Sequence, residues 1–284
     1  MTGKGYGLSD HLHQEFYIDS DGIQLHAKLD LPAGEKAAYP LVIVVHGFTG
    51  HMEEDHYRLT AEALQTNGYA VLRVELYGHG QSDGKFEDHT LLKWVSELLD
   101  VIDYAQTIPH ITELYLLGHS AGGLAVVLAG GIRHSAIRAL LPLSPAISIR
   151  DGARTGHVLG ADFDPVNIPD EVYFPNRGDV APGLMLRGNY FRSAQFLPVE
   201  EAAEAFDGPV LLLHGDADET IPVECSIDLE KHFSRVTFKI IHDDTHCYDR
   251  HLDEVIREIL LFLNDVSGKA DGAAGSGKDP EQRC

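Results

Sequence analysis

Short runs of consecutive apolar residues recur along the chain and alternate with longer segments of mixed pattern. The first run, LVIVV at 41–45, is almost entirely β-branched. Similar apolar runs follow at 69–74, 114–117, 139–143, 210–213 and 236–241. A strand that is covered by helices on both faces needs apolar side chains at every position. These runs therefore predict the strands of a parallel sheet.

Most of the intervening segments have apolar residues at helical spacing. Residues 56–66 would place Leu59, Ala63 and Leu64 on one helix face. Residues 91–105 would do the same with Leu92, Val95, Leu99 and Ile102. Amphipathic helices that alternate with buried strands predict an α/β fold, with a twisted, mostly parallel sheet and helices on both of its faces.

The N-terminal part of the chain has a different pattern. Two segments of alternating character, 15–18 and 23–31, are separated by Asp19-Ser20-Asp21-Gly22. An Asp-Gly turn between such segments is typical of a β-hairpin. We therefore expect an antiparallel pair of strands at this end of the sheet.

The alternation stops between Ala146 and Glu201, where proline, glycine, aspartate and aromatic residues mix without a sustained period. This change predicts a small inserted cap at 146–201, with 1–145 and 202–266 forming the core. Residues 267–284 are mostly small and polar, and they cannot bury enough apolar surface to offset the entropy of ordering. We expect them to form a disordered tail.

Charge and cysteine content narrow the possible partners. The 284 residues carry 44 acidic and 22 basic side chains, a net charge of -22 at pH 7. Such a charge repels phosphate backbones and anionic lipids, and argues against nucleic-acid and membrane partners.

Cys225, Cys247 and Cys284 are too scattered for a disulfide framework. With no signal-peptide core and no run of about 20 apolar residues, we expect a cytoplasmic protein.

The strongest chemical signal is GHSAG at 118–122, a G-x-S-x-G that directly follows the apolar run 114–117 and precedes a segment of small residues. A sharp strand-to-helix turn needs glycine on both sides of the serine, and it lifts the hydroxyl clear of the sheet. Ser120 is therefore a candidate nucleophile at a helix N-terminus. The alternative is a turn without chemistry.

A serine nucleophile needs a base, and the base needs an orienting acid, in the chain order serine, acid, histidine. Asp218 follows the buried strand 210–213, and His246 follows the last strand. The ends of parallel strands meet at one edge of the sheet, where binding sites form. We therefore interpret Ser120, Asp218 and His246 as a catalytic triad.

Nearby residues leave alternatives open. Asp216 competes with Asp218, and His242 and His251 compete with His246. Asp216 can serve as a turn-former and His242 as the end of a strand. A metal site in the histidine-rich stretch 242–247 lacks zinc-type spacing, and Cys247 as nucleophile lacks a strand-turn-helix setting. We predict no metal and no cofactor.

Acyl transfer also needs backbone donors for the oxyanion of the tetrahedral intermediate. The N–H of Ala121, the residue after the serine, is one candidate. The N–H of Phe48 is the other, because His46-Gly47-Phe48 ends the strand 41–45 and Gly47 permits a chain reversal. The alternative for this segment is a plain strand-ending turn.

Five motifs together resemble the α/β-hydrolase superfamily, and within it the bacterial feruloyl (cinnamoyl) esterases. They are HGFTGH at 46–51, YGHGQSDGKFEDHT at 77–90, GHSAGG at 118–123, HGDADETIP at 214–222 and DTHCY at 244–248. The resemblance spans about residues 20–265. It implies an α/β-hydrolase fold, a cap that covers a pocket for aromatic acyl groups, and a homodimer. Ala121 is a departure, because this group often has glutamine there.

The resulting hypothesis is a serine esterase that cleaves a small hydroxycinnamate ester. Asp151, Tyr173 and Tyr190 are candidates to hydrogen-bond a phenolic hydroxyl, or are alternatively surface or packing residues. The rival functions are a short-chain carboxylesterase or monoacylglycerol-type lipase, since the same triad serves any acyl group that the cap admits. A third possibility is a catalytically silent homologue that binds a small molecule.

Overall fold

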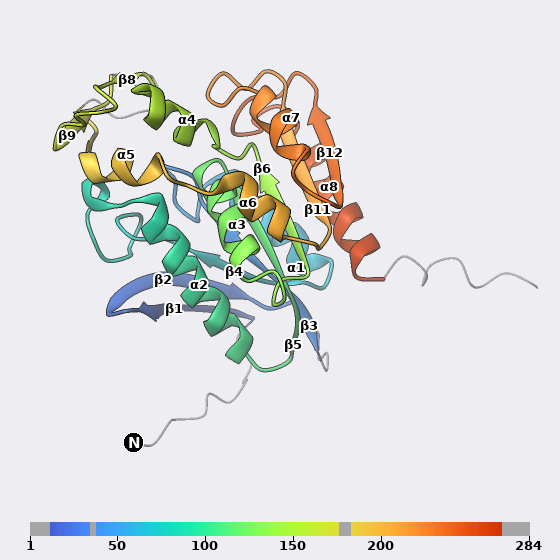
Figure 1. Ribbon diagram of the computed structural model, residues 1–284. Helices are drawn as coiled ribbons and strands as arrows, with labels where there is room; N and C mark the ends of the chain where they lie inside the picture. Colours follow the sequence, from blue (N-terminus) through green and yellow to red (C-terminus); the bar gives the residue numbers. More distant parts are fainter. Residues whose placement is uncertain (1–11, 35–37, 176–182, 269–284) are drawn as a thin grey trace, which may run out of the picture.

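A mixed sheet of eight strands forms the centre of the computed structural model (Figure 1), which describes residues 12–34, 38–175 and 183–268. Its order is β1-β2-β4-β3-β5-β6-β11-β12. The strands are β1 (His13–Ser20), β2 (Ile23–Asp30), β3 (Tyr39–Val45), β4 (Ala70–Val74), β5 (Ile111–His119), β6 (Ala139–Leu143), β11 (Val210–Gly215) and β12 (Val236–Ile241). Neighbours are antiparallel from β1 to β2 and from β2 to β4, and parallel elsewhere. The predicted α/β-hydrolase fold is confirmed.

The antiparallel hairpin turns at the predicted place. Asp21 and Gly22, between β1 and β2, have φ of 50° and 84°. Positive φ at both central residues gives a turn whose twist matches that of the flanking strands, and Asp-Gly tolerates this conformation well. The sequence of the turn thus fixes the register in which Ser20 lies opposite Ile23.

Helices cover both faces of the sheet. The long ones are α1 (Asp55–Thr66), α2 (Leu91–Thr107), α3 (Ala121–Ile132) and α8 (Leu252–Val266). Successive residues of β3 point to opposite faces. Val42 and Val44 pack in a core shared with α1 and α8, whereas Ile43 and Val45 pack in the core shared with α2 and α3. Burial on both faces explains the uninterrupted apolar run.

The buried faces of two helices differ from the prediction. Leu59 of α1 and Leu92 of α2 were expected to face the core, but their side chains are exposed to solvent. Tyr57 and Trp94 are fully buried instead. Successive residues of a helix are about 100° apart, so the apolar residues of one sequence can be grouped on either of two neighbouring faces. The large rings of Tyr57 and Trp94 decide which face packs against the sheet.

The segment between β6 and α6 (Val199–Ala205) has its own small elements. They are α4 (Ser148–Thr155), β7 (His157–Val158), β8 (Ala161–Asp162), β9 (Glu171–Tyr173), β10 (Met185–Arg187) and α5 (Gly188–Ala194). β7 pairs with β8, and β9 with β10, apart from the main sheet. Figure 1 shows this segment beyond the end of α2 and beside the carboxyl end of β6. Of the predicted tail, Ser267 and Gly268 follow α8, and the remainder lies outside the described residues.

Glycines let α3 lie directly against the end of β3. A Cβ on Gly122 would come within 2.3 Å of the carbonyl oxygen of His46 and 2.5 Å of that of Val45. For a Cβ on Gly130, near the other end of α3, the three nearest atoms all belong to the Leu140 side chain, with its terminal carbons at 2.7 Å. A flexible side chain can move away from the added methyl group, whereas the backbone at the end of β3 cannot do so without displacing the strand.

We expect Gly122→Ala to lower the free energy of unfolding by about 2 to 3 kcal/mol, because the methyl group clashes with main-chain atoms. Gly130→Ala is the matched control, since it also gains helix propensity worth about 1 kcal/mol and its clash can relax. Urea denaturation of both variants measures the difference. An equal loss in the two variants would contradict the close packing of α3 on β3.

Candidate active site

Ser120 lies at the turn between β5 and α3, with an unusual backbone conformation. Its φ is 56° and its ψ is −121°, values that cost a non-glycine residue about 1 to 3 kcal/mol. Neighbouring segments hold this conformation: the Ser120 N–H donates to Leu143 O at 2.9 Å, and the Ser120 carbonyl accepts the N–H of Ala146 at 3.0 Å. The turn therefore presents the hydroxyl at the carboxyl edge of the sheet.

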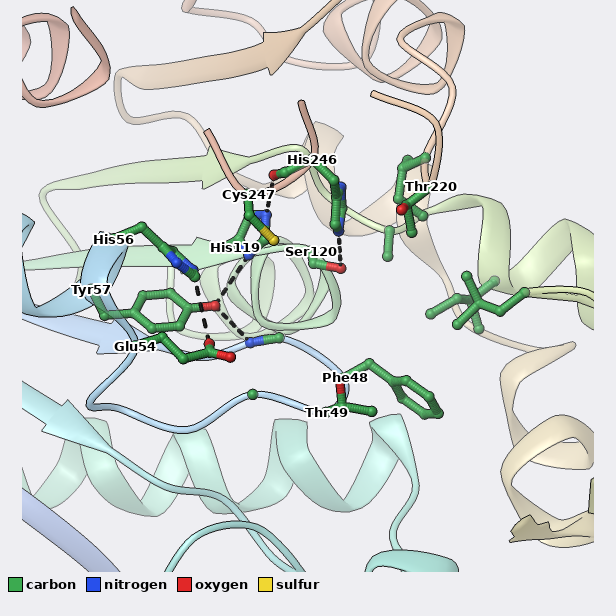
Figure 2. Close-up of a pocket in the computed structure, with 16 residues that line it drawn as sticks. Phe48, Thr49, Glu54, His56, Tyr57, His119, Ser120, Thr220, His246 and Cys247 are labelled. Atoms are coloured by element: carbon green, nitrogen blue, oxygen red, sulfur yellow. Dashed lines mark hydrogen bonds and ion pairs between the residues drawn. The ribbon is translucent and has the colours of Figure 1, made fainter. Parts of the chain in front are cut away.

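The structure brings the three residues of the predicted triad together (Figure 2 shows the Ser120 and His246 side chains). His246 Nε2 is 2.9 Å from Ser120 Oγ, and His246 Nδ1 is 2.7 Å from Asp218 Oδ2. The ionised carboxylate of Asp218 can only accept, so Nδ1 carries the hydrogen and Nε2 is free to accept the serine proton. This is the tautomer that a general base requires.

Asp218 is fixed by several donors. The N–H groups of Thr220 and Ile221 donate to its Oδ1, both at 2.8 Å. Burial raises the pKa of Asp218, but hydrogen bonds from His214 and His246 outweigh it and hold the pKa well below its usual range. The carboxylate therefore stays charged throughout the neutral range. His214 is fully buried and its contribution was not foreseen from the sequence.

The competing residues occupy other places. His242 Nδ1 is 2.8 Å from Asp216 Oδ2, so these two form an exposed pair of their own. His251 is the residue before the first turn of α8. Cys247 lines the pocket at its surface, next to His246. Ser120 Oγ is instead hydrogen-bonded to His246 Nε2.

The loop after β3 lies against the serine. A Cβ on Gly47 would be 3.3 Å from Ser120 Cβ, which explains why glycine is needed there. His46 Nδ1 donates to the Gly47 carbonyl at 2.8 Å, and His79 hydrogen-bonds the Phe48 carbonyl. The N–H groups of Phe48 and Ala121 have no acceptor within the described part of the chain. Both predicted oxyanion donors are thus available.

A chain of hydrogen bonds joins the loop after β3 to His119, which precedes Ser120, and to the backbone of His246 (Figure 2). The Gly47 N–H donates to Tyr57 Oη at 2.9 Å, the Tyr57 hydroxyl is 3.1 Å from His119 Nδ1, and His119 Nε2 is 2.7 Å from the His246 carbonyl. A carbonyl only accepts, so His119 donates through Nε2 and receives the tyrosine hydrogen at Nδ1. Burial lowers the pKa of His119 well below its ordinary value, which keeps it singly protonated.

A pocket opens beside the triad. Its apolar side is lined by Phe48, Ala146, Ile149, Leu159 and Ile221. Thr220 also lines it, and Figure 2 shows Thr220 and Phe48 on the opposite side of Ser120 from Tyr57. The apolar residues come from the loop after β3, from the segment after β6 and from the loop after β11.

The three candidates for a phenolic contact lie elsewhere. Asp151 pairs with Arg150, and Tyr173 is exposed and donates to Glu171. Neither lines the pocket, so the structure does not support a substrate contact for these two. Tyr190 is buried behind Phe48, with ring centroids 6.0 Å apart. Its hydroxyl has no hydrogen-bond partner among the residues that the structure describes.

The described ranges contain no group of three or more histidine, cysteine, aspartate or glutamate side chains that could hold a metal ion. No helix within them has the length and apolar character needed to cross a membrane.

Comparisons with known proteins agree with this geometry. The structure of Est1E from Butyrivibrio proteoclasticus with ferulic acid bound is 47% identical and covers 89% of this chain and 99% of that one, with a TM-score of 0.85. The chain belongs to the α/β-hydrolase family. A family described as serine aminopeptidase, S33, matches residues 36–165 of this hydrolase. The predicted class of serine esterase is confirmed.

Curated relatives of the hydrolase are more distant. The mitochondrial palmitoyl-protein thioesterase ABHD10 of Mus musculus is 26% identical over 196 residues. That match covers 68% of this chain and spans only 64% of the thioesterase. The monoacylglycerol lipase of Mycolicibacterium smegmatis is 29% identical over 257 residues, 80% of this chain and 86% of the lipase.

We expect Tyr57→Phe to lower both the stability and the kcat of this hydrolase. The substitution leaves the Gly47 N–H and His119 Nδ1 buried without a partner, at a cost of about 2 to 4 kcal/mol in the free energy of unfolding. Tyr248→Phe is the control, because Tyr248 is equally buried and its hydroxyl binds Ser144 and Leu213. Both variants should lose stability, but only Tyr57→Phe should lower kcat. An unchanged kcat in Tyr57→Phe would contradict the link to the oxyanion loop.

Tyr190→Phe, in contrast, should not lower the stability of the protein. Because the Tyr190 hydroxyl is buried without a described partner, its removal relieves a desolvation cost and should leave the free energy of unfolding unchanged or raise it by about 1 kcal/mol. Thermal unfolding followed by calorimetry measures the change. A marked loss of stability would reveal a partner for this hydroxyl, such as a buried water.

Proposed function

We propose that this hydrolase cleaves esters of hydroxycinnamic acids through an acyl-enzyme on Ser120. The observation that carries the proposal is the presence of ferulic acid on Est1E, a protein 47% identical over nearly its whole length. The apolar side of the pocket, with Phe48, Ile149 and Leu159, suits a flat aromatic acyl group.

The first step is attack by Ser120 Oγ on the ester carbonyl carbon. His246 Nε2 takes the hydroxyl proton as the new C–O bond forms, and Asp218 stabilises the resulting imidazolium through Nδ1. The carbonyl oxygen, now negative, accepts hydrogen bonds from the N–H groups of Phe48 and Ala121. Loss of one such donor typically costs about 3 to 4 kcal/mol of transition-state stabilisation.

The second step breaks the bond to the alcohol. His246 gives its proton to the leaving oxygen, the carbonyl re-forms, and the acyl group remains on Ser120. A water molecule then takes the place of the alcohol, loses its proton to His246 and attacks the acyl carbon. Collapse of the second tetrahedral intermediate returns the proton to Ser120 and releases the acid.

The segment 146–201 acts in this proposal as a cap that selects the acyl group. Ile149 and Leu159 belong to it and line the pocket close to Ser120. The short acyl chains and monoacylglycerols of the rival functions would occupy the same apolar side. The monoacylglycerol lipase of Mycolicibacterium smegmatis is a relative that supports this alternative.

Cellular context is part of the same proposal. Cys225 is a free thiol, as expected in a reducing compartment, and we propose a cytoplasmic location. The net charge of -22 supports a small neutral ester in preference to nucleic acid as the partner. A homodimer is proposed by analogy with the feruloyl esterases that the sequence resembles.

Steady-state hydrolysis of methyl ferulate and of a butyrate ester tests the function. We expect a higher kcat/KM on the ferulate, and loss of activity on both esters by at least about 10³-fold in Ser120→Ala, because the nucleophile is removed. Activity confined to butyrate would favour the short-chain carboxylesterase. Hydrolysis that persisted in Ser120→Ala would overturn the mechanism.

A further inference from the structure

The pocket has a second, polar side that the proposed acyl group leaves unused. Glu54, His56 and Cys247 line it together with Gly50. Figure 2 shows Glu54, His56 and Cys247 on one side of Ser120, and Thr220 and Phe48 on the other. The two sides therefore differ in chemistry, with the serine hydroxyl between them.

The proton transfers of the proposed mechanism assign this side to the alcohol. His246 must protonate the leaving oxygen, so the alcohol departs along His246 while the acyl group stays on the apolar side. The polar side adjoins His246: the rings of His246 and His119 are 4.6 Å apart, and those of His119 and His56 are 5.0 Å apart. This assignment rests on the proposed function, in which Ser120 and His246 act on an ester.

Glu54 directs its carboxylate toward this side of the pocket and not along its helix. It occupies the N-cap position of α1, yet its side chain makes no capping hydrogen bond. Oε2 would be 2.7 Å from a Cβ on Gly50, so glycine is needed for the carboxylate to lie there. The side chain is 35% exposed, which leaves it accessible to a bound alcohol.

No cation neutralises Glu54 at its nearest described contact. His56 Nε2 is 3.9 Å from Glu54 Oε2, but burial lowers the pKa of His56 to about 4, so this imidazole is neutral at pH 7. His56 Nε2 is itself buried with no hydrogen-bond partner in the described chain. The negative charge of Asp249 also acts on His56. Burial raises the pKa of Glu54, while the nearby His51 acts to lower it through its charge and a backbone hydrogen bond. The carboxylate of Glu54 therefore supplies the negative charge that lines this side.

We propose that Glu54 is a specificity residue that makes the enzyme select esters of neutral alcohols over esters of anionic alcohols. A carboxylate or phosphate on the alcohol would approach Glu54 as the ester reaches Ser120, and the two like charges would repel. A neutral alcohol meets no such repulsion and can use the carboxylate as a hydrogen-bond acceptor. Glu54 touches the alcohol half of the substrate and takes no part in bond breaking.

Two feruloyl esters with the same alcohol skeleton test this selection. Feruloylquinate carries one carboxylate on its alcohol, and feruloylquinamide carries a neutral amide in the same position. Both esters pass through the same feruloyl-enzyme, so the ratio of their kcat/KM values reports only on the alcohol half. In the wild type we expect the amide to be favoured by about tenfold, the size expected for like charges a few ångström apart that are screened by water.

Glu54→Gln should reduce the ratio of kcat/KM values to about twofold, mainly by raising kcat/KM for feruloylquinate. The negative charge of Asp249 accounts for the preference that remains. Activity of the variant on the amide shows that it is folded. Asp55→Asn is the matched control, because it removes one charge from the adjacent residue, which is 82% exposed and pairs with Arg58 outside the pocket. It should keep the wild-type ratio.

Three outcomes would overturn the proposal: a ratio near one in the wild type, an unchanged ratio in Glu54→Gln, or an equal shift in Asp55→Asn. Failure of the feruloyl assignment is recognised separately, since neither feruloyl ester would then be hydrolysed while a butyrate ester is. In that case the ratio of kcat/KM values is measured with butyrylquinamide and butyrylquinate. The same three outcomes would then overturn the proposal for Glu54.

Discussion

The backbone of Ser120, held at φ 56° and ψ −121°, is the constraint on which the rest of the site depends. A residue other than glycine adopts this conformation only where its surroundings enforce it. Here the enforcement comes from β6, whose Leu143 accepts the serine N–H, and from α3, which approaches β3 so closely that Gly122 has no room for a Cβ. The fold thus stabilises the strained turn through many ordinary contacts elsewhere.

Buried neutral histidines connect that turn to the rest of the site. His119, next to the serine, is bonded to Tyr57 on one ring nitrogen and to the His246 carbonyl on the other. His46 accepts the Leu76 N–H through Nε2 and donates to the Gly47 carbonyl through Nδ1. Burial lowers the pKa of both rings, so each keeps one hydrogen and a fixed direction of hydrogen bonding. Both rings therefore remain neutral at pH 7.

The parts of the structure that could be predicted are those with a local signature. Apolar runs indicated the strands, and the turn at Asp21 and Gly22 indicated the hairpin. Ser120, Asp218 and His246 could be found because each follows a strand, and parallel strands end at one edge of the sheet. The faces of α1 and α2 could not be fixed, since the packing of Tyr57 and Trp94 against the sheet decides them.

Residues that act through tertiary contacts could not be predicted either, because their partners are decided by the packing of distant segments. Tyr57 and His214 lie in helical or strand segments where a buried polar residue gives no signal of its partner. Asp151 and Tyr173 were candidates by chemistry alone, and their distance from the pocket depends on how the segment after β6 folds. Local sequence identifies the candidate reactive groups, while the groups that position them emerge only from the packing.

The two sides of the pocket come from different parts of the chain, and this has a consequence for specificity. Ile149 and Leu159 on the apolar side belong to the segment after β6, whereas Glu54 precedes α1 and His56 lies in its first turn. Because Ser120 and His246 lie between them, a change on one side need not disturb the other or the triad. In the proposed function, acyl preference and alcohol preference can therefore vary independently on the same strained serine turn.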